Sequence, residues 1–273
     1  MKQTLKHILS AFSGLIIYSA LTISTCYFTD NMTLAYLIAG VVFSLLGGLY
    51  TSVVLNPNDT RVVPSRKFLI SAFTVVSIYS FVSMFTSNAL IYNFFDSYLQ
   101  TESSGQTAGA VILALIVNVF IAPVAEELVF RGCMYRFLSG IGKKFALIFS
   151  SAIFAVWHGT IVHLYAAFFG GLIFCCIYEK TKSVKYPILA HMLFNGFTVV
   201  IGCFEYPAFV IEPWWVITLN SIFITLLIML FQTPVEHSSR SADKSTLTPA
   251  QLAERRKTAE IVDSVMREHK SRH

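Results

Sequence analysis

Charged residues are scarce in this chain. Asp, Glu, Lys and Arg make up 13% of its 273 residues, whereas hydrophobic residues make up 55%. Soluble domains carry about 25% charged residues, so a chain this apolar would not stay monomeric in water, and lipid must solvate part of it. The sequence also has no CxxC pair and no H-E-x-x-H motif, and therefore lacks two common zinc-binding patterns.

Cysteine is sparse as well. The chain has five cysteines, an odd number, and each lies in or beside an apolar run: Cys26, Cys133, Cys175, Cys176 and Cys203. We interpret them as small buried residues rather than as a disulfide or zinc framework.

Apolar runs long enough to cross a bilayer recur along the chain. A spanning helix needs about 20 mostly apolar residues. The runs predict an all-α, polytopic integral membrane protein with about eight transmembrane helices. These lie near 7–28, 33–55, 68–92, 108–130, 145–160, 162–179, 187–204 and 213–232. We interpret the first run as a retained helix rather than a signal peptide, because the second run follows at once.

The fifth and sixth spans come from one uninterrupted stretch. Residues 145–178 contain no Lys, Arg, Asp or Glu. This stretch is too long for one helix across a hydrocarbon core of about 30 Å. We predict a break at Gly159–Thr160, which gives a tight pair of rather short spans.

Basic residues gather in alternate loops. Lys or Arg occurs before the first span, after the second, fourth and sixth spans, and throughout the tail. The loops in between contain none; their charges are Asp30, Asp96, Glu102, Glu205 and Glu212. Because cytoplasmic loops carry the Lys/Arg excess, we expect an even number of spans in the cell membrane, with both termini cytoplasmic. The net charge of +5 is thus an orientation signal, and no nucleic-acid partner is expected.

Composition divides the chain into a transmembrane domain, 1–235, and a polar cytoplasmic tail, 236–273. Thr248-Pro249 resembles a helix start, so residues 249–268 are expected to form a polar helix. We interpret it as a solvated helix without a dedicated partner; contact of Arg255, Arg256 and Lys257 with anionic lipid head groups is the alternative.

Ionisable groups inside an apolar span mark a candidate functional site. The first set is Glu126, Glu127 and Arg131. Glu127 and Arg131 are helical i,i+4 neighbours in the favourable order, and pairing would neutralise both. Glu126 lies about 100° away around the helix and gains no such partner, which suits a general base. The alternative is a buried ion-pair network that only locks two helices together.

The second and third sets each contain a histidine. His158 ends F-x-x-x-H, and His191 and Asn195 share one helix face at i,i+4 spacing. A satisfied buried histidine is the simpler interpretation for either one alone. Together, His191 and Asn195 could aim two hydrogen-bond donors at an oxyanion, and Glu126 with His158 could orient and deprotonate a water. Phe154 and Trp157 are expected to line the substrate cavity.

These three motifs resemble one known family. E-E-x-x-x-R at 126–131, F-x-x-x-H at 154–158 and H-x-x-x-N at 191–195 occur in this order on separate apolar helices. They are similar to the CAAX protease and bacteriocin-processing family, which includes the type II CAAX prenyl endopeptidases. The match covers the core, roughly 108–200, and the flanking helices match only in being apolar.

The resemblance implies an intramembrane endopeptidase of the glutamic type, acting on a peptide or membrane protein in the lipid bilayer. Glu126 resembles the family's water-activating glutamate, assisted by His158. His191 and Asn195 resemble its oxyanion-stabilising pair, and Glu127 with Arg131 its structural pair. No cofactor is implied. Bacterial members of the family are linked to peptide maturation, bacteriocin processing and self-immunity, and signalling.

Four alternatives stay open. Glu126, His158 and His191 are plausible zinc ligands, and Cys133 lies seven residues after Glu126, so that a Cys–His thiol protease fits the spacing. A carboxylate beside the thiol disfavours the thiolate, however. A proton-coupled transporter could use the same side chains as a relay. A non-catalytic adaptor, immunity or signalling protein could retain the fold without the chemistry.

One geometric condition must hold if these groups are to meet. Glu126 and His158 lie about 15 residues on either side of the turn at Gly140–Lys144, or over 20 Å from it. His191 lies six residues past Lys185, roughly 9 Å away from it. We therefore predict that the fourth helix continues past the membrane to about Leu138. The site would then lie in the cytoplasmic half of the bilayer.

Overall fold

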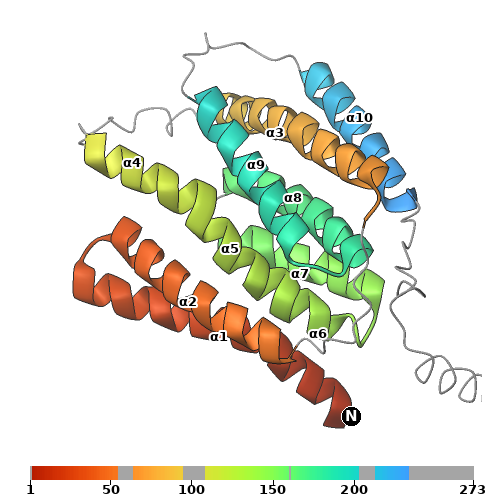
Figure 1. Ribbon diagram of the computed structural model, residues 1–273. Helices are drawn as coiled ribbons and strands as arrows, with labels where there is room; N and C mark the ends of the chain where they lie inside the picture. The colour runs from red at the N-terminus through yellow and green to blue at the C-terminus, as the bar shows by residue number, and fades with distance from the viewer. Residues whose placement is uncertain (1, 55–63, 95–107, 160, 203–212, 234–273) are drawn as a thin grey trace, which may run out of the picture. The chain divides into compact units, whose positions relative to one another are not determined.

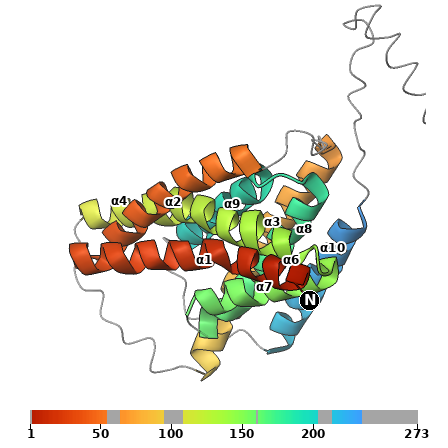
Figure 2. The same ribbon diagram turned by 90° about the horizontal axis from the view of Figure 1, so that it is seen from below.

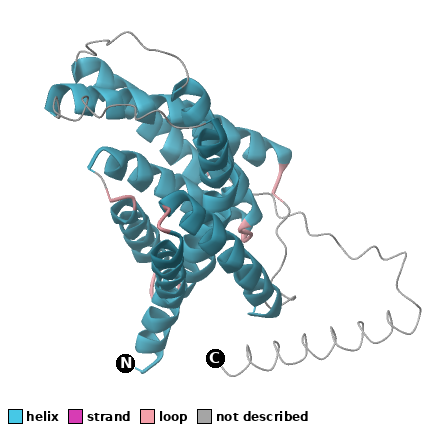
Figure 3. Ribbon diagram, turned by 90° about the vertical axis from the view of Figure 1, so that its left-hand side faces the viewer, coloured by secondary structure: helices cyan, strands magenta, loops and turns pink. Residues whose placement is uncertain are grey.

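The computed structural model describes residues 2–54, 64–94, 108–159, 161–202 and 213–233, and in these residues the chain forms helices and no strand (Figure 3). Seven helices are α1 (Lys2–Thr29), α2 (Met32–Val54), α3 (Arg66–Phe94), α7 (Lys143–Trp157), α8 (Ile161–Thr181), α9 (Lys185–Gly202) and α10 (Pro213–Gln232).

The remaining segments follow one another without a break. They are α4 (Ala108–Ile116), the π-helical segment η2 (Val117–Ile121), α5 (Ala122–Glu127), the π-helical segment η3 (Leu128–Tyr135) and α6 (Arg136–Leu138). We call this continuous element the central rod. Its end at Leu138 is the end predicted for the fourth helix, and each of the eight predicted spans overlaps a described helix. The all-α polytopic class is confirmed.

Five of the described helices contain a stretch long and apolar enough to cross a membrane by length and composition: Thr4–Thr29, Arg66–Ser87, Ile112–Leu138, His163–Thr181 and Trp215–Gln232. Helix α7 is not among them, because its 15 residues reach only about 22 Å. The prediction of a short fifth span is thus confirmed. The sixth span was wrongly expected to be short as well, since α8 has 21 residues.

The central rod lies between two groups of helices (Figure 1). The α1–α2 hairpin packs along one side, and α7, α8 and α9 contact the other. Helices α3 and α10 pack on each other and on α8, and α3 also contacts α9. Figure 2 shows the same helices from below. The polar residues on the rod are thereby enclosed by apolar helices.

Two apolar cores support this arrangement. Tyr18 of α1, Phe130 of the rod and Phe154 of α7 belong to the first core. Tyr79 of α3 and Phe223 of α10 belong to the second, where their rings stack with centroids 4.3 Å apart. The candidate site lies on the rod beside the first core.

Glycine allows α7 and α8 to approach closely. A Cβ atom on Gly171 would lie 3.0 Å from Ser151 Cβ and 3.1 Å from Ser151 Cα, closer than side chains normally pack. The turn between the helices contains Gly159 at φ 71°, a left-handed conformation that favours glycine. The tight pair and the predicted break at Gly159 are both confirmed.

The chain divides into units Met1–His237 and Ser238–His273. The second unit lies outside the described residues, as do the predicted tail helix 249–268 and Cys203. The four described cysteines are free. Three of them are buried as expected, whereas Cys26 is only partly buried.

Candidate active site

The Glu127–Arg131 pair predicted from the i,i+4 spacing is present and fully buried. Arg131 Nη1 donates to Glu127 Oε1 at 2.7 Å, and both side chains have 0% exposure. Arg131 Nη2 donates to the carbonyl oxygen of Gly171 in α8 at 3.0 Å. The guanidinium therefore joins the central rod to α8, at the position where a glycine lets α7 and α8 pack closely.

Two aromatic rings flank the same guanidinium. Arg131 Cζ lies 4.6 Å from the ring centroid of Phe154 and 5.3 Å from that of Phe174. Cation–π contacts of this kind strengthen when they are desolvated. Phe154 is only 1% exposed, so it packs in the core against Arg131 and does not line the cavity described below. Its predicted place in the substrate cavity has no support in this structure.

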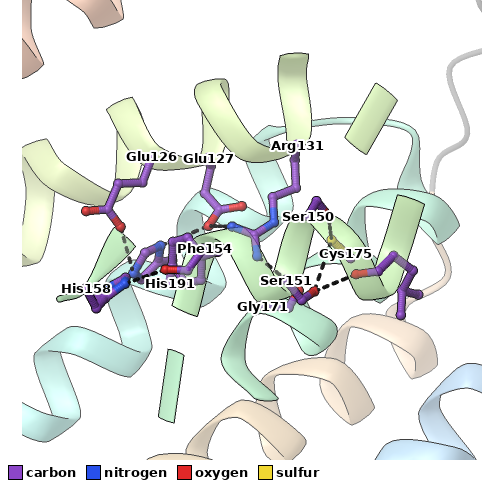
Figure 4. A network of polar contacts seen from close by, with 11 residues as sticks. Glu126, Glu127, Arg131, Ser150, Ser151, Phe154, His158, Gly171, Cys175 and His191 are labelled. Carbon is purple, nitrogen blue, oxygen red and sulfur yellow. Dashed lines mark hydrogen bonds and ion pairs between the residues drawn. The ribbon is translucent and has the colours of Figure 1, made fainter. Parts of the chain in front are cut away.

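His191 of α9 connects the two glutamates of the central rod (Figure 4). Its Nδ1 lies 2.9 Å from Glu127 Oε1, and its Nε2 lies 3.8 Å from Glu126 Oε2. A carboxylate already paired with Arg131 can only accept, so Nδ1 carries the proton and donates to Glu127. In the neutral ring, Nε2 then presents a lone pair toward Glu126.

Glu126 has no such partner on the central rod. Its side chain is 13% exposed, and 3.8 Å to His191 Nε2 is too long for a hydrogen bond. Glu126 also interacts electrostatically with Tyr18 of α1 and Tyr36 of α2. The two neighbouring glutamates thus differ: Glu127 is locked, and Glu126 faces a histidine across a gap that a water could bridge.

His158 caps the C-terminal end of α7 on the same side of the network (Figure 4). Its Nδ1 lies 2.8 Å from the carbonyl oxygen of Phe154. A carbonyl only accepts, so Nδ1–H donates and Nε2 holds the lone pair. The Phe154 ring lies beside both histidines, with centroids 4.7 Å from His158 and 5.7 Å from His191. The structure therefore gathers Glu126, His158 and His191 from three helices.

Asn195 is engaged with the central rod. Its Nδ2 donates to the backbone carbonyl of Asn118 at 2.7 Å. That carbonyl is free because η2 is π-helical: Ala122 N–H donates to Val117 O, and the next residue, Pro123, has no N–H to offer. Asn195 supplies the missing donor. One of its two amide hydrogens is therefore used, and the second is left for another acceptor.

A cavity of about 730 Å³ lies beside this network. It is lined by residues of α1, of the turn that follows and of α2, with Trp157 of α7 as part of its wall. The Trp157 ring packs on Tyr18, with centroids 6.0 Å apart. Trp157 lines this cavity, and its place in a substrate cavity stays a prediction. Trp157 directly precedes His158, whereas Glu126, His158 and His191 do not line the cavity.

The geometry bears on two alternatives, a metal site and a cysteine nucleophile. Among the described residues, no three His, Cys, Asp or Glu side chains gather in a way that could hold a metal ion. Metal independence stays a prediction. Cys133 is buried against Gly14 of α1, whereas the histidine contacts described above are made by Glu126 and Glu127.

The spacing of the motifs could not reveal two of these features. The Glu127–His191 contact joins residues 64 apart in the chain, and Tyr18 and Tyr36 lie outside every motif. The role of Asn195 had a signal in the sequence: Pro123 lies inside an apolar span, and a proline there leaves a carbonyl one turn earlier without its donor.

The chain is similar to known membrane proteins. The family described as "Type II CAAX prenyl endopeptidase Rce1-like" matches residues 108–197. The "Putative membrane peptidase YdiL" of Bacillus subtilis is 34% identical over 93 residues, which are 34% of this chain and 38% of that protein. The "Membrane-embedded CAAX protease MroQ" of Staphylococcus aureus is 28% identical over 219 residues, or 71% of this chain and 85% of that protein.

The match to the Bacillus protein thus spans well under half of that relative's length. No solved structure matches the chain significantly. The family match extends from the start of the central rod to α9 and includes Glu126, His158, His191 and Asn195. The resemblance predicted from the three motifs is therefore confirmed, and over residues 108–197 the chain is similar to the type II CAAX prenyl endopeptidases.

Proposed function

We propose that the protein is an intramembrane endopeptidase that hydrolyses a peptide bond with a water activated by Glu126. The observation that carries this proposal is the pairing of a locked and an unlocked glutamate around His191. Glu127 Oε1 accepts from Arg131 and His191, whereas Glu126 Oε2 faces His191 Nε2 at 3.8 Å. A purely structural ion-pair network would need only Glu127.

The gap beside Glu126 suits a reacting water. A separation of 3.8 Å is too long for a direct hydrogen bond and invites a bridging water. His158 presents a second ring nitrogen as an acceptor, because its Nδ1 is held by Phe154 O. A water in this gap would donate one hydrogen bond to Glu126 and one to the ring of His191 or His158. A lone pair on its oxygen would then be free to attack the substrate carbonyl carbon.

In the proposed reaction, one proton of the water is carried to the departing amine. Glu126 removes one proton from the water as the water oxygen bonds to the carbonyl carbon of the substrate. The proton passes from Glu126 to His191 Nε2, and the resulting imidazolium is stabilised by the Glu127 carboxylate at Nδ1. The tetrahedral intermediate then breaks its C–N bond, and the departing amine takes that proton.

These proton transfers limit when His191 can stabilise the oxyanion, a role that the resemblance implies for His191 and Asn195. His191 with a neutral ring cannot donate from Nε2, because its proton lies on Nδ1 against Glu127. It becomes a donor only after it is protonated, when negative charge develops on the substrate oxygen. The second amide hydrogen of Asn195 is the other proposed donor, with the first held by Asn118 O.

The membrane placement belongs to the same proposal. We propose a cell-membrane protein with both termini cytoplasmic, since the basic residues occupy alternate loops. Helix α7 spans only about 22 Å, so the turn with His158 would lie within the hydrocarbon core. Backbone groups at that depth need protein or water partners, which agrees with a water-containing site. The substrate would be a membrane-associated peptide or protein segment.

The test is comparative peptidomics of cells that carry wild-type protein or Glu126→Gln at equal membrane abundance. A peptidase predicts a peptide that is processed in wild-type cells and accumulates whole in the variant. Truncation after Gln232 serves as a contrast. If Glu126→Gln changes no peptide and no phenotype while the truncation abolishes the phenotype, the chain is an adaptor and the peptidase proposal fails.

A further inference from the structure

Apart from Trp157, the residues that line the cavity on the α1–α2 hairpin lie outside the segment that matches the family. Its lining residues come from α1, the α1–α2 turn, α2 and Trp157, whereas the family match begins at residue 108. Its volume of about 730 Å³ falls in the range of about 300–1,000 Å³ that binds small molecules and short segments. It can hold a few side chains.

The lining of this hairpin cavity has a defined chemistry. Apolar surface comes from Ile23, Met32 and the Trp157 ring, and hydroxyl groups come from residues such as Ser19. The charge is a single carboxylate, Asp30, in the turn between α1 and α2. None of the residues that line the described cavity is basic. The cavity therefore complements an apolar side chain with a cationic group nearby.

One wall residue of the cavity, Trp157, links it to the candidate active site, whose own residues Glu126, His158 and His191 do not line it. Trp157 forms part of its wall and is followed by His158. Tyr36 lines it and interacts electrostatically with Glu126. A ligand packed on Trp157 would thus lie one residue from His158 along α7. The single carboxylate of Asp30 and the nearness of His158 favour a substrate segment with a basic residue as the occupant.

We propose that the hairpin cavity is a substrate-binding subsite. It takes an extended peptide segment through an apolar side chain packed on Trp157, with a Lys or Arg residue of the same segment at Asp30. This inference rests on the proposed peptidase function, and it assigns sequence preference to α1 and α2 rather than to the central rod.

The test measures binding without cleavage. Purified Glu126→Gln protein in liposomes also carries Trp214→Phe and Trp215→Phe, which leaves Trp157 as the only one of the three tryptophans. Two synthetic ten-residue apolar peptides, which differ only by Lys or Glu at one position, are titrated while Trp157 fluorescence is followed. The Lys peptide is expected to give a saturable change at a concentration at least about threefold lower than the Glu peptide.

Two variants probe the cavity itself. Ser19→Phe fills it and should abolish the saturable change. Ile17→Phe, a matched change on the same helix roughly 200° away at a half-exposed position, should leave the change intact. Asp30→Lys should reverse the preference between the Lys and Glu peptides, and this reversal tests the proposal even if Ser19→Phe fails to fold.

Three outcomes of the peptide titrations would overturn the inference. These are no saturable response to either peptide, an unchanged response in Ser19→Phe, or an equal response to both peptides that Asp30→Lys does not alter. If brominated phosphatidylcholine quenches Trp157 and the peptides do not relieve the quenching, a lipid occupies the cavity and the inference also fails. Cleavage of the peptides by the wild-type protein is measured separately. If the peptides bind as expected but the wild-type protein does not cleave them, only the proposed function is contradicted.

Discussion

Asn195 donates its side-chain amide to the backbone carbonyl of Asn118, a hydrogen bond of 2.7 Å between α9 and the π-helical turn η2 of the central rod. The acceptor is available because Pro123 has no N–H at the position where the widened turn needs one. Asn195 therefore holds α9 in register with the rod. His191 lies one turn earlier on α9, so this bond also positions the imidazole against Glu127 and Glu126.

The Pro123–Asn195 relationship predicts a compensating pair of substitutions. Asn195→Ala leaves a carbonyl without a donor and should destabilise the protein by about 1–3 kcal/mol. In a Pro123→Ala background, the restored N–H at this position can pair with Asn118 O, so the same change should cost less than about 1 kcal/mol. Thermal unfolding in detergent measures both costs.

Asn220 provides the control for that cycle. It donates to Thr86 at 3.0 Å and to Val216 O at 2.8 Å, far from η2. Asn220→Ala should have the same cost in the wild-type and in the Pro123→Ala background, because the effects of distant sites add. Additive effects of Pro123→Ala and Asn195→Ala would contradict the role assigned to the asparagine.

The two adjacent glutamates should respond differently to the same substitution. Glu126→Gln should lower turnover by at least about 100-fold, because general-base catalysis supplies about 10²–10⁴, and should leave the melting temperature unchanged. Glu127→Gln should lower the melting temperature, since losing one partner of a buried ion pair costs about 3–5 kcal/mol. A Glu127→Gln protein as stable as wild type would refute the lock described for Arg131 and His191.

The close approach of α7 and α8 should make Gly171→Ala destabilising. Its Cβ would lie 3.0 Å from Ser151 Cβ, and overpacking of this kind costs about 1–3 kcal/mol. Separation of α7 from α8 to make room for the methyl group would also move the Gly171 carbonyl that accepts a hydrogen bond from Arg131. Gly109→Ala, where an added Cβ meets nothing within 4 Å, is the matched control and should be neutral in an unfolding assay. Equal effects at both glycines would contradict this packing.

Local features of the molecule were predictable from the sequence, and contacts between helices were not. Apolar runs and alternating loop charge predicted the helices, and the depth condition predicted the end of the rod at Leu138. The Glu127–Arg131 pair followed from helical spacing. The sharing of Glu127 between Arg131 and His191, and the cavity beside Trp157, depend on how helices pack, which spacing along one helix does not determine.

The proposed water activation by Glu126 is tested most directly with the peptide that accumulates in Glu126→Gln cells. That peptide is incubated with purified wild-type or Glu126→Gln protein in liposomes, and its cleavage is followed by mass spectrometry. The wild-type protein should cleave it, and the variant should be slower by at least about 100-fold with an unchanged melting temperature. Equal cleavage rates in the two folded proteins would contradict the mechanism.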